Sequence, residues 1–141
     1  MTTTLMLRIS ALISLLFAAG HSAGGLQKWS PTPDNPVLTA MTDVRFDMMG
    51  VSRSYLDLYL GLGWSLSVFL LLQAVLLWQM ASLARTNPAQ LRPMIAAFML
   101  ATAATGLIAW LYIFAVPALF SLVLLVALAG AYWTARAPTG A

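Results

Sequence analysis

The side chains that could carry out chemistry are few, and most of them stand in one stretch of the chain. Asp47, Arg53, Tyr55 and Asp57 lie within 11 positions, and His21 precedes them. Together these residues could form a polar site in which a carboxylate or the imidazole acts as a base. A guanidinium would anchor an anion there. The four-residue spacing of Arg53 and Asp57 would place them on one helical face, where they can pair.

The same residues also fit a structural role, and the sequence leaves both interpretations open. A carboxylate in the first turn, such as Asp57, stabilises the N-terminal end of a helix, and Tyr55 fits an aromatic belt at a membrane interface. Asp43 and Asp47 are four apart and could face the same way as ligands of a hard cation. Two carboxylates are too few for a metal site, so we predict a solvated acidic face, no metal and no cofactor.

The amino-acid composition limits the class of protein to which these residues can belong. Of 141 residues, 61% are hydrophobic and only 8% are charged, whereas a soluble domain carries about 25% charged residues. This excludes a soluble globular enzyme, a disordered chain and a coiled coil. The absence of cysteine excludes disulfides and thiolate metal sites. The net charge of +3 comes from scattered cations, which excludes a nucleic-acid partner because phosphate binding needs a basic cluster.

Two long uncharged tracts predict membrane-spanning helices. Between Asp57 and Arg85 lie 27 uncharged residues, which fit one crossing. Between Arg92 and Arg136 lie 43, which as one helix would be about 64 Å long and must therefore fold back. Pro117 is the natural point for a turn or a restart. With an apolar run near the N-terminus, the sequence predicts four spans, 9–26, 58–80, 94–115 and 118–133.

The first apolar run has two interpretations that the sequence does not separate. It can be a retained membrane helix or a cleavable signal peptide with small residues near its end. The segment 27–56 that follows holds three of the four acidic residues, and the fourth, Asp57, comes directly after it. We expect this segment outside the cytoplasm. Within it, Leu38, Met41, Val44 and Met48 recur at helical spacing, which predicts a short helix over Val37–Met49 that Gly50 ends.

The arginines indicate how the chain is oriented. Arg8, Arg85, Arg92 and Arg136 would share one side of the membrane with no acidic residue. Because cytoplasmic loops are enriched in Lys and Arg, we predict a bacterial inner-membrane protein with both termini and the loop 81–93 in the cytoplasm. The segment 27–56 would then face the periplasm.

Polar and small residues inside the spans point to helix packing. Gln73 is the one strongly polar side chain deep in the second span, and we expect it to bond across helices. A pore or ligand contact is the alternative role. Ala97, Ala101, Thr105 and Ala109 form a ridge of small residues that serves packing within the chain or dimerisation. The expected partners are therefore the lipid bilayer and either a second copy, as a homodimer, or another membrane protein. Spans two to four contain no Asp, Glu, Lys or Arg, which disfavours ion-coupled transport.

One sequence pattern carries a family resemblance. After His21 and a polar loop come Phe46-x-Met48-x-Gly50 and then Arg53-Ser-Tyr55-x-Asp57-x-Tyr59-x-Gly61-x-Gly63. This chain resembles a group of small, uncharacterised four-helix bacterial inner-membrane proteins, and in size and helix count it is more distantly similar to DoxX-like membrane proteins. The resemblance implies the four-helix fold and assigns no catalytic residue.

These observations predict an all-α fold: an integral membrane four-helix bundle in one domain, 1–141, with a periplasmic loop or short helix between helices 1 and 2. The expected function is that of a non-enzymatic accessory or structural membrane protein. A first alternative is a small membrane enzyme or lipid-binding protein that uses the polar site at the periplasmic face. A second alternative is a carrier or channel for an uncharged solute.

Overall fold

The computed structural model describes residues 2–25, 32 and 34–136. Four long helices account for most of it. They are α1 (Thr3–Gly20), α3 (Tyr55–Leu83), α4 (Arg92–Tyr112) and α5 (Ala115–Thr134). A π-helical turn, η1 (His21–Gly25), continues α1, and a 3-10 turn, η2 (Pro88–Leu91), precedes α4. The remaining elements are the short helix α2 (Pro36–Asp43) and the strands β1 (Arg45–Met48) and β2 (Val51–Ser54).

The prediction of four apolar helices is confirmed. Each of the four long helical segments in the described part of the chain is long and apolar enough to cross a membrane. Helices suit this setting because a helix satisfies its own backbone hydrogen bonds where lipid offers none. The 29 residues of α3 extend about 44 Å, more than the roughly 30 Å of a hydrocarbon core.

The first helix begins earlier and ends earlier than the predicted 9–26. It starts at Thr3, and the Thr2 hydroxyl accepts a hydrogen bond from the Leu5 amide at 3.3 Å. Arg8 does not limit the helix, because its guanidinium lies 5.2 Å from the centre of the Trp78 ring. The regular helix gives way at Gly20 to the glycine-containing π turn. Residues 26–31 and 33, including part of the predicted segment 27–56, lie outside the described residues.

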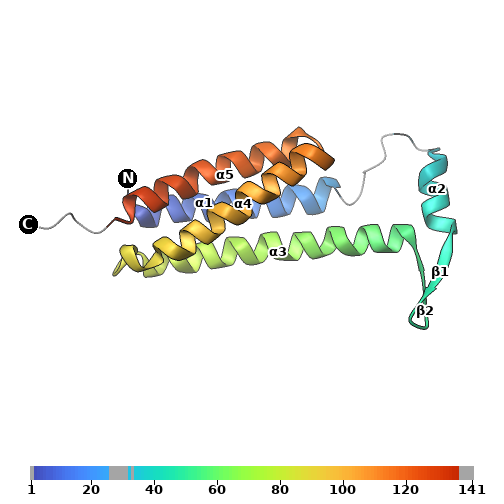
Figure 1. Ribbon diagram of the computed structural model, residues 1–141, viewed down its shortest axis with the longest axis horizontal. Helices are drawn as coiled ribbons and strands as arrows, with labels where there is room; N and C mark the ends of the chain where they lie inside the picture. The colour runs from blue at the N-terminus through green and yellow to red at the C-terminus, as the bar shows by residue number, and fades with distance from the viewer. Residues whose placement is uncertain (1, 26–31, 33, 137–141) are drawn as a thin grey trace, which may run out of the picture. The chain divides into compact units, whose positions relative to one another are not determined.

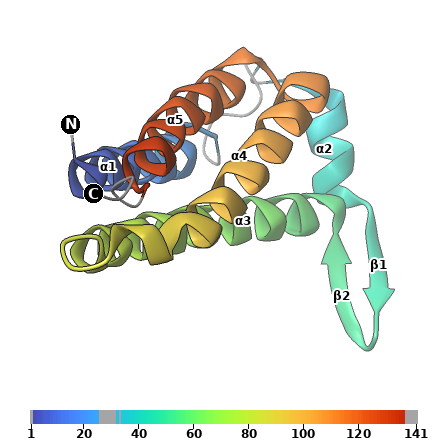
Figure 2. The ribbon, with the colours of Figure 1, turned by 60° about the vertical axis from the view of Figure 1, so that its left-hand side comes forward.

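The last uncharged tract doubles back as predicted, but the break precedes the proline. Helix α4 ends at Tyr112 and α5 begins at Ala115, so the turn falls at 113–114. Pro117 stands in the first turn of α5, where the missing amide proton costs no helical hydrogen bond. Figures 1 and 2 show α4 and α5 side by side. They approach closely at Gly106, where an added Cβ would lie 2.9 Å from the Ser121 Cβ.

The described chain forms two compact units, 1–17 with 70–141 (unit 1) and 18–69 (unit 2). Unit 1 has an apolar core to which all four long helices contribute, with Leu7, Leu77, Ile95 and Leu128 fully buried. Gln73 donates a hydrogen bond to the hydroxyl of fully buried Ser14 at 3.3 Å. The expected bond from Gln73 across helices is therefore confirmed.

The ridge of small residues on α4 does not pack inside this chain as a whole. Ala97, Ala101 and Thr105 are exposed, and of the four only Ala109 is buried. The buried face of α4 instead repeats every seven residues, at Ile95, Thr102 and Ala109. Seven residues are close to two helical turns, so residues at this spacing stay on the face towards the core. Residues spaced by four, such as those of the ridge, shift around the helix and leave that face.

Unit 2 contains a β-hairpin that the sequence analysis did not predict. Helix α2 ends at Asp43, so the helix predicted over Val37–Met49 stops six residues early. The next residues form β1, which pairs antiparallel with β2 in the register Arg45 with Ser54 and Met48 with Val51. Met49 and Gly50 form the two-residue turn with φ of 55° and 85°, the positive values that a tight hairpin turn of type I′ requires.

Candidate functional site

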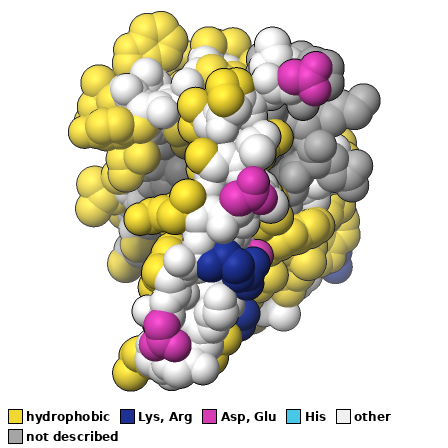
Figure 3. Space-filling model, turned by 90° about the vertical axis from the view of Figure 1, so that its right-hand side faces the viewer, with side chains coloured by type: hydrophobic (Ala, Val, Ile, Leu, Met, Phe, Trp, Pro, Cys, Tyr) yellow, Lys and Arg dark blue, Asp and Glu magenta, His cyan; other side chains and the backbone are white. Residues whose placement is uncertain are grey.

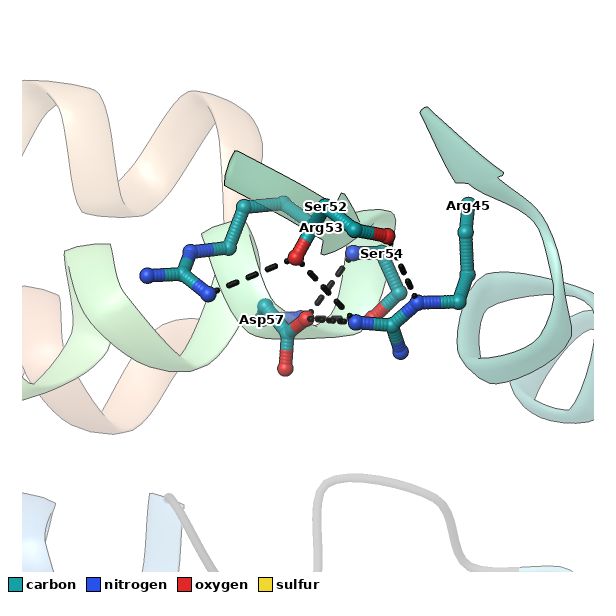
Figure 4. Close-up of polar contacts among 5 residues, drawn as sticks. All are labelled: Arg45, Ser52, Arg53, Ser54 and Asp57. Atoms are coloured by element: carbon teal, nitrogen blue, oxygen red, sulfur yellow. Dashed lines mark hydrogen bonds and ion pairs between the residues drawn. The ribbon is translucent and has the colours of Figure 1, made fainter. Parts of the chain in front are cut away.

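The polar residues of unit 2 meet where the hairpin joins α3. The Ser54 amide donates a hydrogen bond to Asp57 Oδ2 at 2.8 Å, and the Asp57 amide donates to Ser54 Oγ at 3.1 Å (Figure 4). This reciprocal pair has the form of a capping box, which satisfies amides at a helix start that otherwise lack partners. Ser54 is buried, with 3% of its surface exposed. The box therefore fixes the direction in which β2 enters α3.

Arg45 connects the other strand to the same point. Its Nε donates to Ser52 Oγ at 3.1 Å and its Nη2 donates to the Ser52 carbonyl at 3.2 Å. The same Nη2 lies 3.7 Å from Asp57 Oδ2 (Figure 4). Both side chains are about half exposed, at 53% and 45%, so water screens the ion pair. Arg45 thus links both strands of the hairpin to the start of α3.

An aromatic contact and a turn bond complete the hairpin. The rings of Phe46 in β1 and Tyr55 at the start of α3 lie 5.0 Å apart, tilted by 51°, a favourable aromatic geometry. Asp47 Oδ1 accepts a hydrogen bond from the Gly50 amide at 3.1 Å and so stabilises the turn. Tyr55 and Asp47, two of the predicted site residues, therefore both make contacts that hold the hairpin together.

His21, in η1, contacts α3 at a different point from this cluster. Its Nε2 is 3.1 Å from the Gly63 carbonyl oxygen, and the next residue, Ser22, donates to Ser67 Oγ at 2.9 Å. Gly63 is six residues beyond Asp57 in the same helix, about 9 Å along its axis. Within the described residues the imidazole thus joins η1 to the first half of α3 and has no contact with the predicted acids.

The predicted pairing of Arg53 with Asp57 is wrong, and the possible shared face of Asp43 and Asp47 does not form. Arg53 and Asp57 do not share a helical face, because Arg53 belongs to β2 and its Nη1 donates to the Ser52 carbonyl at 3.4 Å. The arginine that pairs with Asp57 is Arg45. Asp43 and Asp47 do not share a face either, because the first ends α2 and the second lies in β1.

The arrangement of charges favours structure over acid–base chemistry. Figure 3 shows acidic and basic side chains near one another among exposed hydrophobic ones. The hydrogen bond from the Ser54 amide, together with the charge of Arg45, lowers the pKa of the Asp57 carboxyl. A carboxylate with a lowered pKa is a weaker proton acceptor and stays ionised, so it is also unsuited to act as a proton donor. Among the residues that the structure describes, no group of three or more His, Cys, Asp or Glu could hold a metal ion.

Sequence reasoning missed Arg45 and Ser54, the two residues that complete the cluster. The signal for Ser54 was present, because Ser54-x-x-Asp57 has the spacing of a capping box before an apolar run. Arg45 carried no such signal, since its role depends on the hairpin. Comparison of the chain with protein-family models, curated proteins and solved structures gives no match. The resemblance to small four-helix inner-membrane proteins stays a prediction.

Proposed function

We propose that the protein is a non-enzymatic accessory protein of a bacterial inner membrane that crosses the bilayer four times. The four long apolar helices support the membrane location. The four arginines at 8, 85, 92 and 136, which no acidic residue accompanies, favour a cytoplasmic position for both termini and for the loop 81–93. In this orientation α2 and the hairpin face the periplasm.

The observation that carries the proposal is the set of polar contacts that attach the hairpin to the start of α3. Ser54 and Asp57 hydrogen-bond to each other, and Arg45 bonds to Ser52 and pairs with Asp57. An isolated two-stranded hairpin is marginally stable in water, so these bonds, with the contact between Phe46 and Tyr55, give it a defined shape. A hairpin held in this way is a rigid projection suited to docking.

The tip of the hairpin is apolar and strained, which points to a binding role. Met49 is 99% exposed, and its neighbours Met48 and Val51 are exposed as well. Met49 has a φ of 55°, a left-handed conformation that Asn or Gly adopts more easily than a long side chain. A methionine at this position costs stability in the free protein, and its flexible apolar side chain is well suited to a protein interface. We infer that Met49 inserts into a partner protein.

The test is site-specific photo-crosslinking in cells. A benzophenone side chain at position 49 should give one discrete adduct, while the same group at Asp43, the exposed end of α2, should give none. The partner identified from the adduct should co-purify with the wild type and not with Met49→Asn, a substitution that suits the turn and removes the apolar side chain. Absence of an adduct from position 49, or equal co-purification with both proteins, would contradict the proposal.

A further inference from the structure

The Asp, Glu, Lys and Arg side chains of unit 1 all carry the same sign. They are Arg8, Arg85, Arg92 and Arg136, whereas all four aspartates, at 34, 43, 47 and 57, belong to unit 2. Within the described residues none of the four guanidinium groups has a hydrogen-bond or ion-pair partner, and the buried Nε of Arg92 is unsatisfied. The part of unit 1 that the structure describes thus holds four positively charged side chains and no acidic side chain.

These four arginines surround one end of the unit 1 core. Each directly follows a buried residue of that core, the four core residues being Leu7, Ala84, Leu91 and Ala135. Thr3 at the start of α1 donates to Thr134 at the end of α5 at 3.1 Å, which brings these two helix ends together. Figure 1 shows the start of α1 and the end of α5 at the end of unit 1 where α3 leads into α4. We call this region the arginine end.

Aromatic rings hold three of the four guanidinium groups. The Cζ atoms of Arg92 and Arg136 lie 4.3 and 3.9 Å from the ring centres of Tyr132 and Trp133, and Arg8 lies over Trp78 at 5.2 Å. A guanidinium on a ring face keeps its N–H edges free for acceptor oxygens. Tryptophan and tyrosine are also the residues that concentrate at the headgroup level of a bilayer. The arginine end therefore presents preorganised donors at the depth of lipid phosphates.

We propose that the arginine end binds the phosphate headgroups of anionic phospholipids. A phosphodiester offers two unesterified oxygens that match the fork of a guanidinium, and basic clusters between membrane helices bind such headgroups. A lipid is the fitting source of the phosphate because its acyl chains can cover the apolar helix surfaces beside the arginines, among them exposed Leu83 and Met94. The leaflet follows from the orientation proposed above, but binding itself does not depend on it.

The test is native mass spectrometry of the purified, delipidated protein in detergent, titrated with phosphatidylglycerol or phosphatidylcholine. The wild type should retain phosphatidylglycerol and not phosphatidylcholine. The variant Arg85→Gln/Arg136→Gln removes two exposed arginines, and each loss should weaken binding about five-fold. Arg53→Gln, an arginine of unit 2, is the matched control and should bind like the wild type.

Three results would overturn the proposal. The first is equal retention of the two lipids by the wild type, and the second is unchanged phosphatidylglycerol binding by the double variant with its folding intact. The third is displacement of the lipid by inorganic phosphate at equal concentration, which would indicate a soluble anion as the ligand. Circular dichroism and thermal melting of both variants verify that any loss of binding does not come from unfolding.

Discussion

Ser54 and Asp57 exchange two hydrogen bonds, from the Ser54 amide to the carboxylate at 2.8 Å and from the Asp57 amide to the hydroxyl at 3.1 Å. We predict that Ser54→Ala weakens the start of α3 by about 1 kcal/mol, the usual cost of losing an N-terminal cap. Hydrogen exchange of the amides in the first turn of α3 should then become about five-fold faster. The hairpin should lose protection as well, since β2 leads directly into this turn.

Ser65→Ala is the matched control for this prediction. Ser65 lies within α3, where its hydroxyl only donates back to the Gly61 carbonyl at 2.9 Å, a bond that adds little to helix stability. Its removal should leave exchange in the first turn unchanged. Equal exchange in the two variants would show that Ser54 does not cap the helix.

Gly106 allows α4 and α5 to approach each other. A Cβ at this position would lie 2.9 Å from the Ser121 Cβ, which is attached directly to the backbone and cannot swing away. Gly106→Ala should therefore destabilise the protein by about 1–3 kcal/mol, measured by thermal or denaturant unfolding in detergent. Gly61→Ala, where nothing lies within 4 Å, should be neutral or slightly stabilising. A neutral Gly106→Ala would contradict the close approach of the two helices.

Gln73 and Ser14 should be energetically coupled. The Gln73 amide donates to the Ser14 hydroxyl at 3.3 Å, and such bonds between membrane helices contribute on the order of 0.6 kcal/mol. A double-mutant cycle of Gln73→Leu and Ser14→Ala, read from unfolding in detergent, should return a coupling energy near that magnitude. Strictly additive effects of the two substitutions would exclude the bond.

We predict that the mature protein retains α1. Leu7, Ser10 and Ser14 are fully buried in unit 1, and cleavage after the first apolar run would remove them and expose the core they cover. The mass of the purified protein should therefore include this segment. A mature N-terminus beyond Gly20 would show that the run is a signal peptide and would require a different core for unit 1.

The long helices could be predicted from the sequence because lipid imposes a simple requirement. A tract without charges has to form helices of roughly bilayer length, and the tracts after Asp57 and Arg92 do so. Exact ends depend on local contacts instead. α1 begins before Arg8 and includes it, because the guanidinium packs over the ring of Trp78. Trp78 lies 70 residues away in the sequence.

The hairpin and the cluster at its base could not be predicted with the same rules. Leu38, Met41, Val44 and Met48 match helical spacing, yet the chain leaves the helix at Asp43. The strands are only four residues long, too short for a clear alternation, and the turn has Met49 where Asn or Asp usually stands before Gly. Arg45 meets Asp57 only because β1 pairs with β2. The rule that residues four apart share a helical face therefore predicted Arg53 as the partner instead.

The most direct test of the membrane account is labelling of single cysteines, which the absence of native cysteine permits. Asp43 at the end of α2 and Asn87 in the turn after α3 are both exposed, and they lie on either side of α3 in the sequence. In intact spheroplasts a membrane-impermeant maleimide should label Asp43→Cys at once and Asn87→Cys only after permeabilisation. Labelling of both positions from the outside would contradict a membrane-spanning α3, and labelling of Asn87→Cys alone would reverse the proposed orientation.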